Sequence, residues 1–459
     1  MSVPLSSPPN VSANTAETKS VDLSGWGRFP SVQGVSYRIS DERDVRGQVS
    51  SGPVIARGNG RSYGDSAAQP NGTLDMRSMS HMIDFDEETG ILVAEAGVIL
   101  GDVIAAFLPR GWFPPVTPGT KFVTLGGMIA ADVHGKNHVR DGSIRRYIEW
   151  IDVMGADGVI RRASNDSEKG LFDWTVGGMG LTGVILRCAI RLMRVDTGWI
   201  RQETHVAQNL SVALDIFDEN QSRYAVAWFD CLATGGALGR SIVMLGEHAD
   251  IADLASVQQA DPYSIPARRR LKVPFDAPGF ALNRYSLRAF NSLYYKAQSR
   301  KSGGSVVDWE SFFYPLDAIL GWNRIYGRRG FAQYQVALPL GQSKAGLNAL
   351  LDEISSSGEG SFLAVLKRLG PEEGPISFPL EGYTLALDFA VSDKVLALLE
   401  RLDAITLEHG GRPYLAKDSR IKAATFHRAD PRADEYVRYR KRTGAGPIFA
   451  SLQSLRLKI

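Results

Sequence analysis

The sequence has little cysteine, no long uninterrupted apolar run and almost no net charge, and each absence excludes a class of protein. Its two cysteines, Cys188 and Cys231, are too few for a disulfide framework or a cysteine-type zinc site. The longest apolar stretch, residues 91–108, is interrupted by Glu95 and Asp102, so we expect no transmembrane helix. A net charge of +2 excludes a surface that is basic throughout, and we expect no nucleic-acid partner.

The N-terminal region also lacks the features of a targeting segment. It has neither the basic start nor the apolar centre of a secretory signal peptide. Its content of Ser, Pro, Asn and Thr predicts a flexible leader over residues 1–22. The whole chain of 459 residues is too long for one ordinary core, so two domains are expected.

The pattern along the chain predicts an α+β protein. Residues 32–194 read as short β-strands and brief helices separated by glycine-rich turns. After Thr197 the runs become aromatic and alternating, which is typical of an antiparallel sheet with one covered face. Amphipathic helices at residues 343–358 and 392–411 have the spacing needed to cover such a sheet.

One glycine-dense segment, PVIARGNGRSYGDSAAQPNGTLDM at residues 53–76, follows a short apolar run. Its glycines do not have the spacing G-x-G-x-x-G, and no amphipathic helix follows, so it is not a Rossmann turn. Glycines allow backbone amides to converge on an anion, and Arg57 and Arg61 add positive charge, so this segment suits a pyrophosphate. A plain glycine-rich hairpin remains the alternative for this segment alone.

Two further glycine-rich segments, at residues 114–143 and 175–185, favour a long cofactor such as FAD that is cradled in several places. The order of the motifs RGNGRSYGD, PGT, TLGG, HGKNH and GGMGLTG resembles the vanillyl-alcohol-oxidase class of FAD-dependent oxidoreductases. In the C-terminal half, AWFD, GWNRIYG, QYQ, VLKRLGP, ISFP and YLAKDSR are similar to the branch of that class that oxidises polyprenyl-phosphoryl ribose. The resemblance covers nearly the whole chain from Leu23 onward.

The resemblance implies a set of FAD contacts, held noncovalently. Because the glycine-rich loop offers Tyr63 and no histidine, His134 is the only candidate for a covalent link. The implied cofactor residues are Ala56, Arg57, Gly58, Asn59, Gly60, Arg61, Ser62, Tyr63, Gly64, Asp65, Ser66, Gly119, Thr124, Leu125, Gly126, Gly127, Ala131, Asp132, Val133, His134, Ile185 and Tyr414.

The resemblance also implies a substrate side, whose chemistry is reasonable for these residue types. Oxidation of a hydroxyl needs a proton acceptor or a cation beside the alkoxide, and His134 and Lys417 are the candidates. The implied substrate-binding residues are Trp228, Arg324, Gln333, Gln335 and Lys367. The two glutamines are two positions apart in a strand and share a face, whereas the cations suit a phosphate. His138 follows His134 by four residues, but no carboxylate is near in sequence, so no metal site is expected.

The segment from residue 266 to 301 has a composition unlike the rest. It contains nine basic residues and one acid, Asp276, with six interleaved aromatic residues. Such a mixture suits an anionic lipid surface, although a solvated basic loop has the same composition. The basic residues are Arg268, Arg269, Arg270, Lys272, Arg284, Arg288, Lys296, Arg300 and Lys301, and the aromatic residues are Phe275, Phe280, Tyr285, Phe290, Tyr294 and Tyr295.

The chain departs from the pattern it resembles at a few pocket positions. Ala386 stands where the family has a cysteine, Thr384 where it has asparagine, and Leu369 where it has phenylalanine. These changes leave the residues expected for hydride transfer in place, but they reshape the pocket. Covalent inhibitors that need the family's thiol should therefore fail here.

The expected reaction is the FAD-dependent oxidation of the 2′-hydroxyl of a polyprenyl-phosphoryl-β-D-ribose to the 2′-keto sugar. An NAD(P)H-dependent keto-reductase would complete epimerisation to the arabinose form, and the enzyme would bind a membrane surface peripherally, on a side left undecided. A soluble sugar or alditol oxidase of the same class and a noncatalytic flavin-binding protein are the alternatives. The expected domains are a FAD-binding part at 23–195, an inserted antiparallel-sheet substrate domain at 196–411 and a FAD-binding return at 412–459.

Overall fold

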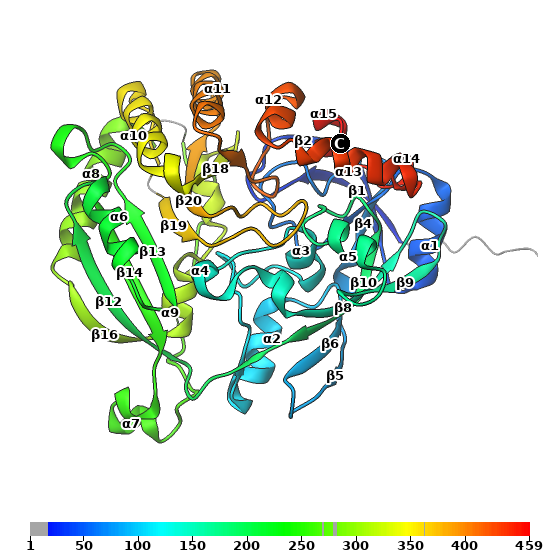
Figure 1. Ribbon diagram of the computed structural model, residues 1–459, viewed down its shortest axis with the longest axis horizontal. Coiled ribbons are helices and arrows are strands. Elements are labelled where there is room, and N and C mark those ends of the chain that lie inside the picture. Colours follow the sequence, from blue (N-terminus) through cyan, green and yellow to red (C-terminus); the bar gives the residue numbers. More distant parts are fainter. Residues whose placement is uncertain (1–16, 269, 279–281, 362) are drawn as a thin grey trace, which may run out of the picture.

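The computed structural model describes residues 17–268, 270–278, 282–361 and 363–459, and in it the chain forms two sheet-based parts that lie side by side (Figure 1). The first part holds a four-stranded and a five-stranded sheet. The four-stranded sheet has the order β1 (Thr18–Ser24), β2 (Ser31–Arg38), β4 (Thr73–Asp75) and β3 (Ile55–Arg57). The five-stranded sheet has the order β5 (Met82–Phe85), β6 (Ile91–Glu95), β10 (Val184–Arg191), β8 (Ile148–Met154) and β9 (Ile160–Ala163).

Strand β1 begins at Thr18, within the N-terminal leader that the sequence predicts. It pairs antiparallel with β2 over its whole length, so the prediction of a flexible leader is wrong for residues 18–22. The strand is mostly polar, and Leu23, which is 2% exposed, is the residue that anchors it in the core. Pairing with a neighbouring strand, rather than its own apolar content, holds this segment. Residues 1–16 lie outside the described part of the chain.

Helices cover the sheets of the first part, and several of them come from the other end of the chain. Phe426, Tyr436 and Phe449 from the C-terminal helices are buried in the cores of the first part, so the chain returns to it. These helices lie over β1, β2 and β4 in Figure 1. The helices of this part are α1 (Glu42–Ser51), α2 (Leu100–Phe107), α3 (Leu125–Ala130), α4 (His138–Asp141), α5 (Lys169–Thr175), α12 (Ala423–Ala429), α13 (Arg432–Arg442), α14 (Ala445–Ile448) and α15 (Leu452–Leu457).

The second part is built on an eight-stranded sheet. It is antiparallel between all neighbours and includes the strands predicted after Thr197. Its order is β16 (Gly303–Asp308), β12 (Trp199–Ala207), β14 (Ser241–His248), β13 (Tyr224–Phe229), β19 (Ala364–Leu369), β20 (Gly382–Ala390), β18 (Phe331–Pro339) and β21 (Arg412–Pro413). The pairing of β18 with β21 is also antiparallel, and it places the last strand just beyond residue 411, the boundary expected from the sequence.

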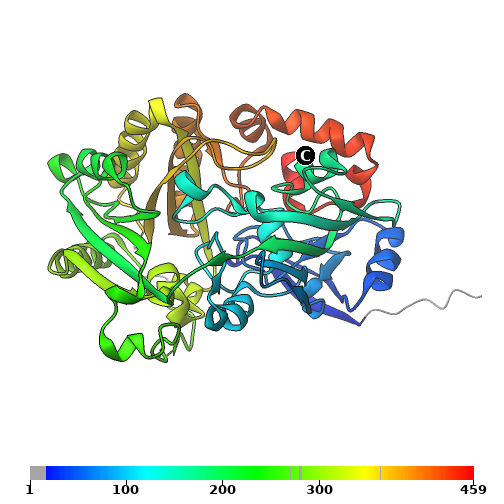
Figure 2. The ribbon, with the colours of Figure 1, turned by 60° about the horizontal axis from the view of Figure 1, so that its bottom comes forward.

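Three helices cover one face of this sheet, while the opposite face turns toward the first part (Figures 1 and 2). They are α6 (Leu210–Glu219), α10 (Leu340–Ser357) and α11 (Asp393–Glu408). Leu350 and Leu398 are fully buried in the core between these helices and the sheet. The prediction of an α+β chain with an antiparallel sheet covered by helices is therefore confirmed.

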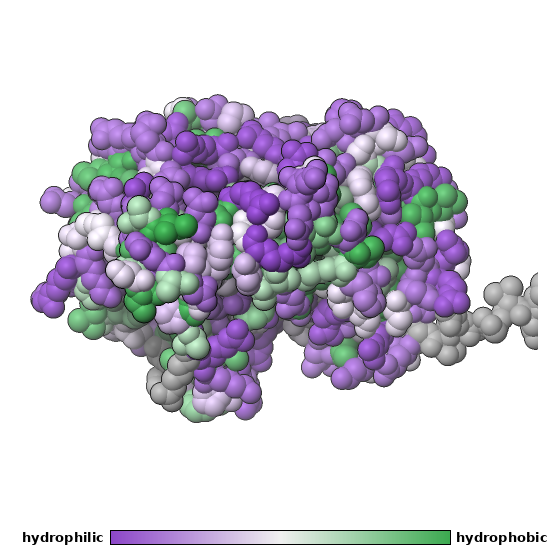
Figure 3. All heavy atoms as spheres, turned by 90° about the horizontal axis from the view of Figure 1, so that it is seen from below, coloured by the Kyte–Doolittle hydropathy of each residue, from purple (hydrophilic) through white to green (hydrophobic). Residues whose placement is uncertain are grey.

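Besides several 3-10 turns, the described chain has short strands and helices and the longer helix α8, some of which border the space between the two parts. These are β7 (Trp112–Phe113), β11 (Met193–Arg194), β15 (Leu271–Lys272), β17 (Ile319–Leu320), α7 (Ser256–Gln259), α8 (Arg284–Ser299) and α9 (Trp309–Phe313). Within the described residues, no helix is long and apolar enough to span a bilayer. The face shown in Figure 3 is mainly hydrophilic, with hydrophobic residues in small groups.

Candidate active site

A cavity of about 880 Å³ lies between the two parts of the molecule. Its size is within the range of ~300–1,000 Å³ that is typical of small-molecule and cofactor sites. One wall comes from the glycine-rich loop at 56–64 and from residues 117–136, and the other from the open face of the eight-stranded sheet. Residues far apart in the sequence thus meet at one site, as His134 and Gln335 do.

The glycines allow three segments to pack closely around this cavity. A Cβ atom on Gly58 would lie 2.1 Å from Thr124 Oγ1, and one on Gly64 would lie 2.1 Å from the Asp418 carbonyl oxygen. The backbone of Tyr63 donates to the Ala416 carbonyl at 2.9 Å, which ties the loop to the C-terminal return. Side chains at these two glycine positions would force the walls apart.

Almost all the residues that the sequence predicts for the cofactor line the cavity. The exceptions are Asp65, Leu125 and Asp132. Asp65 accepts two hydrogen bonds from Arg456 and so anchors α15, while Leu125 is a core residue that is 1% exposed. Asp132 is fully buried, and Ser377 Oγ donates to its carboxylate. These three residues support the walls of the site from behind.

His134 lies in the cavity wall after α3 and is 5% exposed. Its Nε2 accepts from Gln335 Nε2 at 3.3 Å, and its Nδ1 has no hydrogen-bond partner within the described residues. Burial, followed by the charges of Lys367, His138 and Lys417, lowers the pKa of His134 well below its usual value. The imidazole is therefore neutral near pH 7 and able to accept a proton.

Lys417 also lines the cavity, and its Nζ lies 3.8 Å from the centroid of the Tyr63 ring. Asp418, its neighbour in sequence, pairs with Arg456 and not with Lys417. The carboxylate of Asp388 on β20 interacts with the charge of Lys417, and Asp388 Oδ1 accepts from Gln333 Nε2 at 2.5 Å. Burial lowers the pKa of Lys417 and raises the pKa of Asp388, and the attraction between the two groups opposes both shifts.

Two more lysines add positive charge to this part of the cavity. Lys367 on β19 has a pKa lowered to about 8 by burial, and it forms no ion pair within the described chain. Lys136 donates to the Phe312 carbonyl, and burial, followed by the charge of Lys367, lowers its pKa to about 7. Lys136 lies within the HGKNH motif, but the sequence alone predicts no role for it. Buried cations without anionic partners are typical of a site that takes an anion.

The substrate-side residues predicted from the sequence meet on the sheet wall, with one exception. Gln333 and Gln335 lie on one face of β18, and Trp228 on β13 contacts Tyr294 of α8 with ring centroids 4.6 Å apart. Arg324 does not line the cavity, because its guanidinium binds Asp276 at 3.1 Å and the Pro274 carbonyl at 2.8 Å. In the part of the chain that the structure describes, no group of His, Cys, Asp and Glu side chains could hold a metal ion.

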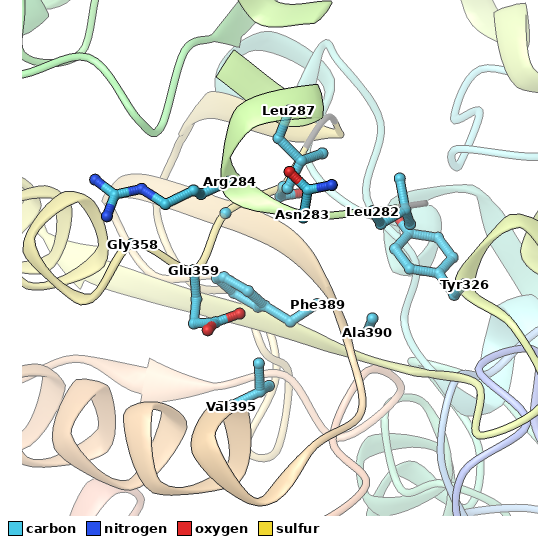
Figure 4. Close-up of a pocket in the computed structure, with 12 residues that line it drawn as sticks. Leu282, Asn283, Arg284, Leu287, Tyr326, Gly358, Glu359, Phe389, Ala390 and Val395 are labelled. Carbon is cyan, nitrogen blue, oxygen red and sulfur yellow. The ribbon is translucent and has the colours of Figure 1, made fainter. Parts of the chain in front are cut away.

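A second, much smaller cavity lies under the first turn of α8 (Figure 4). Its volume of about 30 Å³ has room for little more than a water molecule. Phe389 of β20 and Val395 of α11 close it from the side opposite α8. Leu282 and Leu287 line both cavities, so the start of α8 separates them.

The comparisons with known proteins first identify the class of cofactor. Residues 48–164 match the family model of an FAD binding domain, which covers the glycine-rich loop and the HGKNH segment. Part of the chain is 24% identical, over 223 residues, to L-gulonolactone oxidase of Mus musculus; the match covers 46% of this chain and 49% of that protein. The protein is an FAD-dependent oxidoreductase.

A longer match defines the family. The chain is 36% identical over 454 residues to decaprenylphosphoryl-β-D-ribose oxidase of Mycolicibacterium smegmatis, covering 95% of this chain and 97% of that protein. An uncharacterised protein of Streptomyces coelicolor is 32% identical over 361 residues, covering 76% and 97%. The chain belongs to the decaprenylphosphoryl-β-D-ribose oxidase family of FAD-dependent enzymes.

The residues present fit FAD. Four cavity-lining side chains have a buried polar atom without a hydrogen-bond partner within the described residues, and such atoms are rare unless a ligand or water satisfies them. These atoms are Arg61 Nε, Ser66 Oγ, Thr117 Oγ1 and His134 Nδ1. The glycine-rich loop and residues 117–127 would hold the cofactor's phosphates and ribityl chain, and the end near His134 and Lys417 would hold its ring system.

Proposed function

We propose that this protein oxidises the 2′-hydroxyl of a polyprenyl-phosphoryl-β-D-ribose to the 2′-keto sugar. The observation that carries the proposal is the meeting of His134, Lys417, Gln333 and Gln335 on one cavity that also opens onto apolar side chains of α8. The name of the Mycolicibacterium relative supports the same substrate class. An NAD(P)H-dependent keto-reductase would then reduce the keto sugar to the arabinose form.

The chain's own residues handle the proton of the substrate hydroxyl. We propose that His134, neutral because burial lowers its pKa, accepts the hydroxyl proton, while Lys417 stabilises the negative charge that develops on the oxygen. The Gln335 amide donates to His134 Nε2 at 3.3 Å, so this nitrogen holds the lone pair of the neutral ring, and the substrate hydroxyl would take the amide's place there. FAD, when bound, supplies the acceptor for the hydride that leaves C2′. We further propose that FAD is held noncovalently, so acid precipitation should release it into the supernatant.

The sheet wall is proposed to hold the sugar. Gln333 and Gln335 are 9% and 7% exposed and offer amide groups to sugar hydroxyls. Lys367 and Val365 lie on β19 and both line the cavity, where Lys367 adds a buried positive charge. Trp228 offers an aromatic face. For Arg324 the expected contact with the substrate phosphate stays a prediction, and it would require release from Asp276.

We propose that the segment 266–301 docks the enzyme peripherally on an anionic membrane, on either side. Leu271, Phe275, Tyr285 and Leu293 are more than half exposed, at 55%, 66%, 74% and 69%. Of the basic residues described in this segment, Arg268 alone forms an ion pair within the described chain, with Asp308. The segment's acid, Asp276, is bound by Arg28 and Arg324, which lie outside it. Arg269 and Phe280 lie outside the described residues.

An anaerobic titration tests the function. The purified flavoprotein is mixed with synthetic polyprenyl-phosphoryl ribose, and the absorbance of oxidised flavin is followed. We expect stoichiometric bleaching, with a 2′-keto product identified by mass spectrometry. Bleaching by free sugars or alditols alone would identify a soluble sugar oxidase, and no bleaching by either would favour a noncatalytic flavoprotein.

A further inference from the structure

Arg61 is a cavity-lining cation that forms no ion pair within the described chain, although the charge of Asp317 acts on it. Its guanidinium carbon lies 4.1 Å from the centroid of the Trp26 ring and 5.0 Å from that of Phe122. Its Nε is buried and has no hydrogen-bond partner, and the group forms no ion pair within the described chain. Burial lowers its pKa. A partly desolvated guanidinium of this kind is stabilised when a ligand brings an anion.

Arg57, four residues earlier in the same loop, is held differently. Its Nη2 donates to the Ser24 carbonyl at 2.7 Å and its Nη1 to the Ala67 carbonyl at 3.3 Å. Arg57 therefore braces the loop against the backbone. Of the two loop arginines, Arg61 is the one whose guanidinium remains available to a ligand.

Arg61 lies where the wall assigned to the cofactor meets an apolar part of the cavity, because its guanidinium lies over Phe122 as well as Trp26. Tyr63 is two residues further along the loop, and Lys417 Nζ lies over its ring at the proposed reaction site. Trp26 packs edge-on against Trp322, with ring centroids 5.8 Å apart. The two tryptophans belong to an apolar group whose other cavity-lining members include Leu316, Ile319, Ile325 and Leu363.

The cavity has the three kinds of group that a lipid-linked sugar needs. Its lining combines proton-accepting groups, a guanidinium without an ion pair in the described chain and an apolar wall, which suit the sugar, the phosphate and the prenyl chain of the substrate. The apolar wall continues to the surface at Leu320, which is 37% exposed and whose strand β17 pairs with β15. Exposed Leu271 lies on β15, within the segment proposed to dock on a membrane.

We propose that Arg61 binds the phosphate of the lipid-linked sugar and so sets the specificity for a phosphorylated, prenylated substrate. The proposal rests on the proposed function and deepens it. A planar guanidinium fixed between two aromatic rings can donate two parallel hydrogen bonds to phosphate oxygens. The same chemistry would suit the pyrophosphate of FAD, the role that the sequence resemblance implied, so the test separates the two phosphates.

The test compares Arg61→Gln and Arg61→Lys with the matched variant Arg110→Gln, because Arg110 also lies over two aromatic rings, Phe85 and Phe107, but does not line the cavity. Flavin content is read from the absorbance spectrum of each purified protein. Binding of farnesyl phosphate, with farnesol as the phosphate-free control, is read from the perturbation of the flavin spectrum. Single-turnover flavin reduction is then measured at several concentrations of polyprenyl-phosphoryl ribose.

We expect Arg61→Gln to keep its flavin, to lose binding of farnesyl phosphate but not of farnesol, and to raise the half-saturating substrate concentration at least about ten-fold with little change in the limiting rate. Arg61→Lys should recover part of the binding, and Arg110→Gln should bind farnesyl phosphate normally. Loss of flavin from Arg61→Gln would assign Arg61 to the cofactor and overturn the proposal. Normal behaviour of Arg61→Gln in every assay would overturn it as well. Failure of the wild-type flavin to be reduced would instead contradict the proposed function, because farnesyl phosphate binding does not depend on turnover.

Discussion

At the scale of single residues, the account depends on His134 being a neutral base. Replacing it with Ala should slow flavin reduction by about 100-fold or more, the usual contribution of a general base. His248→Gln is a control, because His248 is partly buried but contacts Tyr224 and does not line the cavity. Stopped-flow reduction under anaerobic conditions measures both, with flavin content checked in each variant.

The pH dependence of the wild type tests the same claim. Because the pKa of His134 is lowered well below its usual value, the base stays deprotonated as the pH falls from 8 to 6. The rate of flavin reduction should therefore show no loss with an apparent pKa near ~6.5, the usual value for histidine. A loss at that pH, absent from the slower His134→Ala variant, would contradict the account.

Ala386 gives a second prediction at this scale. It lines the cavity between Val365 and Gln335 in neighbouring strands, where the family carries a thiol. Both cysteines of the chain are buried, and burial raises the pKa of Cys188 and of Cys231 to about 12. Intact-protein mass spectrometry should find no adduct with inhibitors that need the family's thiol, and Ala386→Cys should gain one. An adduct on the wild type would contradict this.

At the residue scale, recognisable motifs predicted most of the residues that line the cavity, but not the residues whose place depends on distant contacts. HGKNH contains Lys136, but its place in the cavity becomes clear only from its hydrogen bond to the Phe312 carbonyl, 176 residues away. No sequence pattern singles out Trp26, because its importance comes from the contact of its ring with the Arg61 guanidinium. Asp65 lies in the glycine-rich loop, yet its carboxylate forms an ion pair with Arg456 and does not line the cavity. No local sequence pattern predicts that ion pair.

At the scale of elements, alternation and amphipathicity predicted the long strands and the helices that cover the large sheet. They did not predict β1, which is polar, or α13, where eleven residues include five arginines and lysines. In α13 the buried side chains are Ala433, Tyr436, Tyr439 and Arg440, and they face partners such as Gly178 that are distant in sequence. Contacts of this kind, and not local hydrophobicity, hold such elements in place.

Helix α8 carries a prediction of its own. Leu293 is 69% exposed on this basic helix, and Leu455 is 61% exposed on α15, so the two make a matched pair. Leu293→Asp should weaken flotation with vesicles that contain anionic lipid, and Leu455→Asp should not. Binding should also fall as salt is raised, because charges attract the helix to the lipid. Equal flotation of both variants would contradict docking through this segment.

At the scale of the whole molecule, the buried lysines make stability depend on pH. Burial lowers the pKa of Lys136 to about 7 in the folded protein, whereas an unfolded chain has a lysine pKa of ~10.4. The unfolded state thus binds more protons between pH ~7 and ~10, and the free energy of unfolding should rise with pH across that window by up to ~1.4 kcal/mol per pH unit from this group.

The flavin-free protein provides the measurement, by urea unfolding at several pH values. Lys136→Met should reduce the rise of the unfolding free energy with pH and stabilise the protein at pH 7. Lys344→Met, at an exposed lysine, should leave the pH dependence unchanged. The same slope in Lys136→Met and in the wild type would mean that Lys136 is not held in a desolvated site.

The central claim is that the hydrogen on C2′ of the lipid-linked ribose leaves as hydride while His134 takes the hydroxyl proton. The most direct measurement is single-turnover flavin reduction by polyprenyl-phosphoryl ribose deuterated at C2′, compared with the same substrate deuterated at C3′. The account predicts slower reduction for the C2′ label and an unchanged rate for the C3′ label. Equal rates for both, or slowing by the C3′ label alone, would contradict it.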